Sequence, residues 1–89
     1  MISRLHASFR RDFAKLPSEI QKRARAAYRR FRNDPSHSGL QFKRLHSQLP
    51  LWSVRITDSY RAVGIRTDDT IVWFFIGTHA EYDRMLANL

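Results

Sequence analysis

The chain has 89 residues, with 16 Lys or Arg, eight Asp or Glu, no cysteine and a formal net charge of +8. A chain of this length buries little more than about 60% of its unfolded surface, which leaves room for one core and excludes a two-domain cofactor enzyme. We therefore expect a single domain over residues 1–89. The absence of cysteine excludes disulfides and thiolate zinc sites. Together with the lack of a signal peptide and of an apolar span of about 20 residues, it predicts a cytoplasmic protein with no membrane partner.

The net positive charge lies entirely in the first third of the sequence. Residues 1–33 contain ten Lys or Arg and two acidic residues, whereas the remainder contains six of each. Such asymmetry favours a polyanionic partner, namely a nucleic acid, an anionic membrane or an acidic protein segment. The alternative is a solvated helix face that only keeps the protein in solution.

Residues 18–31 are predicted to form an amphipathic helix. Pro17 is tolerated at a helix entrance, Ser18 with Gln21 fits a capping box, and Asp34-Pro35 ends the helix because a residue before proline avoids the α region. A shorter helix precedes it and completes a helical hairpin. The apolar positions at helical spacing are Phe9, Phe13 and Leu16 in the first helix and Ile20, Ala24, Ala27, Tyr28 and Phe31 in the second. The basic residues opposite them are Lys22, Arg25, Arg29 and Arg32.

Three antiparallel strands are predicted at residues 52–57, 60–66 and 71–76, because apolar residues alternate there between the turns Asp58-Ser59 and Asp68-Asp69. The last strand, IVWFFIG, is apolar on both faces, which favours a central position covered on both sides. The hairpin covers one side, and either the C-terminal segment 80–89 or a partner chain covers the other. The fold class is therefore α+β, with a helical hairpin packed on a small antiparallel sheet and a short C-terminal helical turn.

Arginines occupy strand positions that normally carry neutral residues. Arg61 shares a strand face with Val63 and Ile65, so it is either paired with an internal anion or lines a concave site. Arg55 points away from the apolar face of its own strand. Arg66 lies on the face opposite to that of Arg61.

His79 follows the last strand directly, where a functional side chain is often placed, and histidine exchanges protons near neutral pH. The alternative is a capping or packing residue. The other histidines show no metal-ligand spacing, no glycine-rich phosphate loop is present, and we expect neither a metal nor another cofactor. A histidine, a tyrosine and several cations suit the metal-free cleavage of a phosphodiester.

The stretch FKRLHSQLPLWSVRITDSYRAVGIRTDDTIVWFFIGTHAEYD resembles the sheet half of RelE/ParE-superfamily toxins of bacterial toxin–antitoxin pairs, and FRRDFAKLPSEIQ is similar to their helical hairpin. The segment WSVRITDSYRAV is similar to YoeB-like members, and GTHA is similar to the end of YafQ-like members. The resemblance implies a ribosome-dependent endoribonuclease that cuts messenger RNA and is neutralised by a cognate antitoxin. It also implies that operator DNA can be bound through the toxin–antitoxin complex.

The resemblance assigns roles to single residues. Arg61 matches the arginine that faces the scissile phosphate, His79 matches the histidine at the end of the last strand, and Tyr82 lies close to a C-terminal aromatic position of the family. These three residues are the expected catalytic set. The expected RNA-binding residues are Lys43, Arg44, His46, Arg55 and Arg66.

One departure from the family pattern concerns the general base. The carboxylate of YoeB-like members falls near Leu40 or Gln41 here, and neither can accept a proton, so the base is His79 or His46. Members of the ParE branch share the fold, lack the nuclease residues and inhibit DNA gyrase, which is the alternative function. A third interpretation is a non-catalytic basic module that binds nucleic acid together with its partner.

Overall fold

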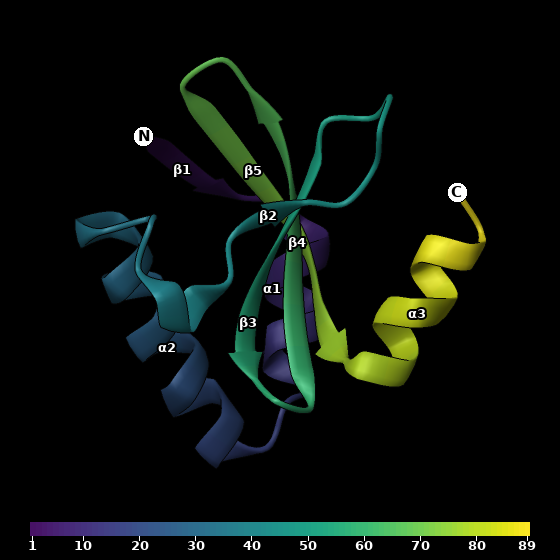
Figure 1. The fold of residues 1–89 in the computed structure, drawn as a ribbon. Coiled ribbons are helices and arrows are strands. Elements are labelled where there is room, and N and C mark those ends of the chain that lie inside the picture. The colour runs from purple at the N-terminus through teal and green to yellow at the C-terminus, as the bar shows by residue number, and fades with distance from the viewer.

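The computed structural model describes residues 1–89 and contains a five-stranded sheet and three α-helices (Figure 1). The elements are, in chain order, β1 (Ile2–Leu5), α1 (Ala7–Ala14), α2 (Ser18–Asn33), the 3₁₀ turn η1 (Ser38–Leu40), β2 (Lys43–Arg44), β3 (Leu51–Thr57), β4 (Tyr60–Thr67), β5 (Thr70–Thr78) and α3 (His79–Ala87). The radius of gyration is 12.0 Å, close to the roughly 13 Å of a compact chain of about 100 residues. No helix is both long and apolar enough to span a membrane. The predicted α+β class is confirmed.

The strands are ordered β1-β5-β4-β3-β2, and all neighbours are antiparallel except β1 and β5, which run parallel. The three predicted strands correspond to β3, β4 and β5, and their two hairpin turns lie where the sequence predicts them. Asp68 takes a left-handed conformation in the second turn (φ 54°), which aspartate tolerates better than most residues do.

Strand β1 was not predicted from the sequence. Its four residues ISRL are too short to show a period, and they pair in register with residues 70–73, which are almost the whole chain away. Because β1 lies on the outer side of β5, β5 has a strand neighbour on both sides. The expectation that β5 lies inside the sheet is therefore confirmed.

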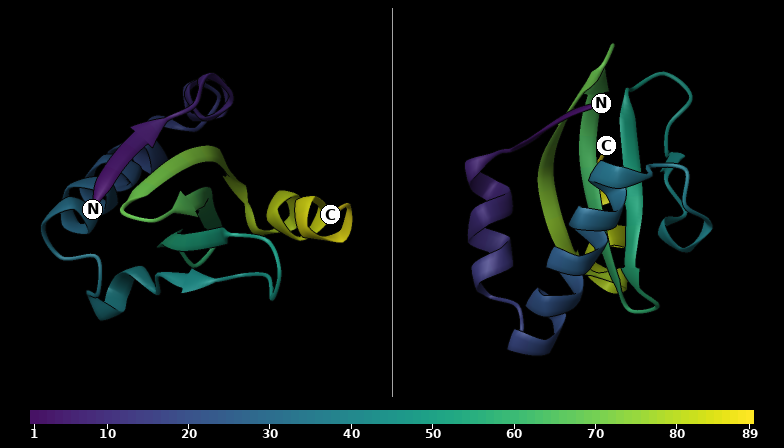
Figure 2. Two further views of the ribbon diagram at one scale, coloured as in Figure 1. Left: turned by 90° about the horizontal axis from the view of Figure 1, so that it is seen from above. Right: turned by 90° about the vertical axis from the view of Figure 1, so that its left-hand side faces the viewer.

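The sheet is covered on both faces. Helices α1 and α2 lie on one face and α3 packs against the other (Figure 2). The larger core, under α1 and α2, contains Ala24, Ala27, Phe31, Leu40, Val54, Ala62, Ile71, Trp73 and Ile76. The smaller core, under α3, contains Leu51, Val63 and Tyr82. The second cover of β5 is thus the C-terminal segment of the same chain.

The start of α2 differs from the prediction. Pro17 occupies the cap position with ψ 148°, and no side chain caps the helix, because Ser18 already has helical geometry. Gln21 does not complete a capping box. Its amide instead donates a hydrogen bond to the carbonyl oxygen of Phe13 (3.0 Å), which ties the start of α2 to the end of α1.

Gly64 of β4 lies opposite Trp73 of β5. A Cβ atom on Gly64 would lie 2.9 Å from Cγ1 of Ile71, 3.0 Å from Cε3 of Trp73 and 3.0 Å from the carbonyl oxygen of Val72. The register of the two strands also shifts between Val63 and Gly64. Glycine is therefore required here by close packing, since its backbone conformation is an ordinary one.

Candidate active site

His79 is held at the junction of β5 and α3. The preceding Thr78 caps α3: its hydroxyl accepts the N–H of Glu81 (3.2 Å), and the Glu81 carboxylate accepts the N–H of Thr78 (2.9 Å). The Thr78 hydroxyl also donates to the Glu81 carboxylate (2.9 Å). The two hydrogen bonds that the carboxylate accepts, from the backbone N–H and from the hydroxyl of Thr78, hold the pKa of Glu81 below its ordinary value. The N–H of His79 donates to the carbonyl oxygen of Ser59 (2.8 Å), so the backbone of His79 is fixed against the β3–β4 turn.

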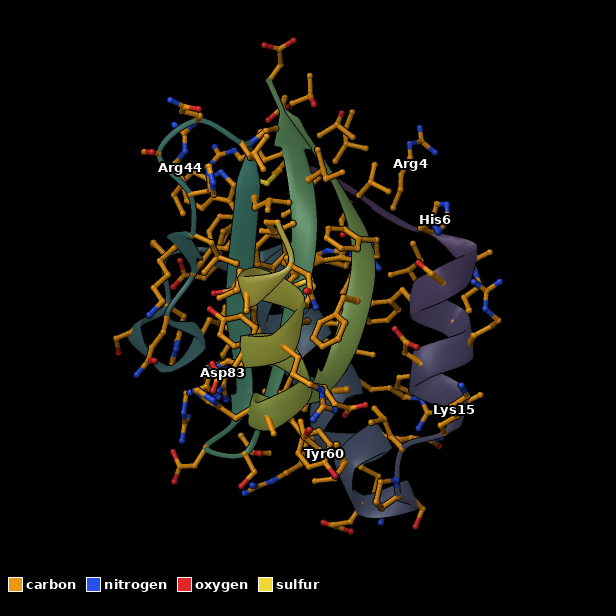
Figure 3. The ribbon with its side chains drawn as sticks, turned by 90° about the vertical axis from the view of Figure 1, so that its right-hand side faces the viewer. Arg4, His6, Lys15, Arg44, Tyr60 and Asp83 are labelled. Atoms are coloured by element: carbon orange, nitrogen blue, oxygen red, sulfur yellow. The ribbon has the colours of Figure 1, made fainter.

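The ring of His79 is oriented by its own helix. Nδ1 lies 3.1 Å from Oδ2 of Asp83, four residues on, and the ring meets the edge of Tyr82 with centroids 5.5 Å apart. Figure 3 shows Asp83 on the flank of α3 that is nearer to β3 than to α1. Because Nδ1 faces a carboxylate and 49% of the side chain is exposed, Nε2 is left free toward solvent.

The other three histidines accept hydrogen bonds from backbone N–H groups. His6 caps α1, His37 caps η1, and His46 accepts the N–H groups of Gln48 and Leu49 within the loop between β2 and β3, in each case through Nδ1. When Nδ1 accepts an amide N–H, the proton of the neutral ring is on Nε2, so neither nitrogen has a free lone pair to take a proton from a substrate. Of the two candidate bases, the geometry therefore favours His79 over His46.

Arg61 lies opposite Arg55 in the β3–β4 ladder and opposite Gly77 in the β4–β5 ladder, two residues from His79. Its Nη1 donates to the carbonyl oxygens of Thr57, Tyr60 and Asp58, so the half-buried guanidinium braces the turn and makes no ion pair. Its Nε and Nη2 groups make no hydrogen bond within the chain. These donors can reach a ligand anion.

Arg55 forms an ion pair with Asp58. The hydrogen bond from Arg55, together with its charge, holds the pKa of the Asp58 carboxyl below its ordinary value. We call the end of the sheet that is formed by residues 55–61 and 77–79 the turn end. It brings together Arg55, Arg61 and His79.

The other basic residues that the sequence predicts lie on both faces of the sheet. Lys43 pairs with Ser53, which pairs with Val63, so Lys43 shares a sheet face with Arg61 at a backbone distance of about 12 Å. Arg44 lies on the opposite face, toward the far end of the sheet from Asp83 and Tyr60 (Figure 3). Arg66 is also on that face, where its guanidinium stacks 4.6 Å from the ring centroid of Trp52.

Tyr82 is 7% exposed and belongs to the smaller core, so its ring has a packing role as well as its contact with His79. Leu40, near which the family pattern predicts a carboxylate, is 2% exposed in the larger core. Asp83, the carboxylate that does contact a candidate base, was not predicted. Its four-residue spacing from His79 is the signal that could have identified it.

Comparison with known proteins agrees with this architecture. Residues 18–84 match the family model described as the ParE-like toxin domain. No curated protein matches the chain in sequence. The chain is similar to a chain of the RelB–RelE antitoxin–toxin complex from Methanococcus jannaschii, with a TM-score of 0.73 and 20% identity over 91% of this chain and 96% of that one.

Two further solved structures are similar in the same way. YafQ from E. coli superposes with a TM-score of 0.71 at 15% identity, covering 90% of this chain and 94% of that one. A chain of the RelBE2 toxin–antitoxin complex from Mycobacterium tuberculosis gives a TM-score of 0.61 at 28% identity, covering 88% and 96%.

The hairpin-covered sheet and the family match define the class of protein, which is that of the ParE-like toxin domains. The matched residues make up most of the chain. The chain therefore belongs to the ParE-like toxin family.

Proposed function

We propose that this toxin, one domain over residues 1–89, is a metal-independent, ribosome-dependent endoribonuclease that cleaves messenger RNA and thereby inhibits translation. The observation that carries the proposal is the placement of His79, whose exposed ring is oriented by Asp83 beside the arginines of the turn end. A net charge of +8 also suits binding to RNA on the ribosome in the cytoplasm.

The chemistry is a proton transfer coupled to attack within the RNA. Nε2 of His79 takes the proton of a 2′-hydroxyl, the 2′-oxygen attacks the adjacent phosphorus, and the 5′-oxygen leaves with a proton from Tyr82 or from water. The products are a 2′,3′-cyclic phosphate and a 5′-hydroxyl. Arg61 stabilises the added charge on the phosphate through Nε and Nη2. Arg55 and Lys43, on the same face, contact neighbouring phosphates.

The test follows protein synthesis and DNA synthesis in parallel after induction of the toxin. Removing a general base typically costs about 10²–10⁴ in rate, so His79→Ala should abolish the immediate fall in protein synthesis. Arg61→Ala should do the same. Arg84→Ala is the matched control, because Arg84 is an exposed residue of α3 whose side chain makes no bond in the structure. Circular dichroism checks that each variant folds, since Arg61 also braces the β3–β4 turn. Undiminished inhibition of translation by folded His79→Ala would refute the nuclease.

Inhibition of DNA gyrase is the second candidate, and the match to the ParE-like family model favours it. In that case DNA synthesis falls before protein synthesis, and His79→Ala remains toxic. The order in which the two syntheses stop therefore separates the two functions in the same experiment.

The partner that we propose is a cognate antitoxin, and the surface that suits it is the groove between α1 and α2. This groove has a volume of about 480 Å³. Its apolar floor consists of Leu5, Phe9, Phe13, Ala24 and Tyr28. Its basic rim consists of Arg10, Arg25 and Arg29. An apolar floor with a basic rim fits an acidic amphipathic segment. Operator DNA would then be bound by the complex of the two proteins.

A further inference from the structure

A second basic hollow lies between α2, η1 and the outer edge of β3. Figure 1 shows η1 between α2 and β3. The hollow has a volume of about 250 Å³, and Arg23 and Arg30 of α2 and Arg55 of β3 line it. It exists because β2 pairs only with Trp52 and Ser53, which leaves the rest of β3 without a strand neighbour on that side.

The walls of this hollow keep it open and polar. Between Arg23 and Arg30, which are seven residues and about 10 Å apart along α2, the helix presents only the small side chains of Ala26 and Ala27. Gly39 contributes no side chain on the η1 side. The two arginines therefore flank the hollow with nothing bulky between them.

The positive charge of the hollow is only partly neutralised within the chain. No Asp or Glu lines it, and neither Arg23 nor Arg30 forms an ion pair. Arg55 is paired with Asp58, whose side chain is 91% exposed and lies outside the lining. Arg55 is the chief cause of the lowered pKa of Asp58, and Arg61 and Arg23 add to it, so the positive field reaches from the hollow to the turn end.

We propose that this hollow binds a phosphodiester group of the RNA strand whose scissile phosphate lies at the turn end, an inference that rests on the proposed nuclease function. Guanidinium groups bind phosphate oxygens in a bidentate manner, and Arg55 belongs to both the hollow and the turn end. On binding, Arg55 exchanges the Asp58 carboxylate for a phosphate oxygen.

The lining favours a nucleic acid over an acidic peptide. Peptide segments bind through apolar anchors, and the groove between α1 and α2 offers aromatic side chains for such anchors. The hollow is lined by Ala26, Ala27, Leu40 and Ile56, by the backbone of Gly39, and by arginine and threonine groups. Leu40 is only 2% exposed and none of the apolar residues is aromatic, so most of the accessible lining is polar. The hollow therefore suits a charged oxygen-rich group better than an apolar anchor.

The first test is a titration of the protein with inorganic phosphate, followed through backbone amide signals. We expect saturable shifts at Ala26, Gly39 and Thr57 in the wild type and their loss in the double variant Arg23→Gln/Arg30→Gln. The control Arg10→Gln/Arg29→Gln removes the same charge from the rim of the other groove and should keep the shifts. Equal loss in both variants, or no saturable shift at these amides, would overturn the proposal.

The second test measures binding of a 2′-O-methylated oligouridine, which cannot be cleaved through its 2′-oxygen, as a function of salt. Loss of one phosphate contact should reduce the slope of log K against log salt by about 0.7 in Arg23→Gln/Arg30→Gln and not in the control. An unchanged slope overturns the site. The site is also overturned if an oligothymidylate of equal length binds more tightly than the oligouridine. The same holds if a glutamate-rich peptide binds more tightly than the oligouridine and its binding depends on these two arginines.

The two proposals fail separately. If the phosphate shifts and the slope change are found but His79→Ala still stops protein synthesis, the hollow stands as a phosphate site and the nuclease falls. If His79→Ala is inactive but the slope does not change, the nuclease stands and the hollow is refuted.

Discussion

At the scale of single residues, the carboxylate that serves the candidate base comes from α3. Asp83 faces Nδ1 of His79 at 3.1 Å, and a carboxylate in that position favours the tautomer with the proton on Nδ1 and the lone pair on Nε2. Asp83 thus acts as a positioning residue. It takes no proton from the RNA itself.

We predict that Asp83→Ala lowers the rate of ribosome-dependent RNA cleavage at least about tenfold, which is part of the roughly 10²–10⁴-fold that a general base contributes. Asp83→Asn should lose less, because the amide oxygen can still accept the Nδ1–H. Nitrogen NMR of the His79 ring reports the tautomer directly. If the tautomer and the rate stay the same in Asp83→Ala, then Asp83 is only a surface residue of α3.

Part of this site could be predicted from the sequence. The strand end identified His79, and alternation placed Arg55 away from the face that carries Trp52 and Arg61 on the same face as Val63. The β3–β4 register then shows that Arg55 and Arg61 share a face. The orientation of His79 could not be predicted, since it depends on α3 beginning at His79 itself. The sequence also does not show which of Lys43 and Arg44 shares a face with Arg61, because that depends on the β2–β3 register.

At the scale of the elements, the start of α3 is set by Thr78. Loss of a capping side chain costs about 1 kcal/mol. Thr78→Ala also removes the hydroxyl that donates a hydrogen bond to the Glu81 carboxylate. We predict a corresponding fall in the free energy of unfolding at pH 7, measured by chemical denaturation.

The same variant has a defined pH dependence. Because the folded-state pKa of Glu81 is lowered, its ionised form stabilises the fold above the ordinary carboxyl pKa, and this contribution is lost as the pH falls through the lowered value. The difference between wild type and Thr78→Ala should therefore shrink between pH 7 and pH 3. A constant difference would mean that the Glu81 carboxylate takes no part in the cap.

The contact between β4 and β5 depends on Gly64. Gly64→Ala should destabilise the protein by about 1–3 kcal/mol, since overpacking of a tight core has costs of that size. The added Cβ would meet the Val72 backbone at 3.0 Å, and a backbone atom cannot move aside as a side-chain tip can. Thermal unfolding measures the effect. The comparison variant is Ala26→Gly, which removes a Cβ atom from the exposed side of α2 instead of adding one to the core. An unchanged melting temperature in Gly64→Ala would show that the strands can separate at low cost.

The periodic elements of the fold were predictable because their apolar faces repeat within one segment. Helix α2, strands β3 to β5 and helix α3 all have this property. Strand β1 does not, because its pairing is decided by residues 70–73. The start of α2 was also beyond sequence reasoning, because a Pro17 cap and a Ser18 cap differ only in backbone angles.

At the scale of the whole molecule, the excess charge is divided between two surfaces of different character. The groove between α1 and α2 combines arginines with exposed aromatic area, whereas the hollow beside β3 is polar. This difference is the reason for proposing a protein partner at the groove and a nucleic acid at the hollow.

For the protein partner, we predict that Arg25→Glu/Arg29→Glu weakens binding of the cognate antitoxin at least about tenfold, because like charges across an interface cost several kcal/mol. Calorimetric titration measures the affinity. Arg84→Glu on α3 is the control and should bind as the wild type does. If both variants bind equally, the antitoxin does not use this groove.

The parallel pairing of β1 with β5 has a consequence for how the toxin is made. Strand β1, Ile2–Leu5, is synthesised well before its only partner in the sheet, residues 70–73. The sheet cannot close until that partner has also emerged, and His79 follows it by only six residues. The nascent chain therefore completes the sheet and the junction that holds His79 at nearly the same time, once residues 70–79 have been synthesised.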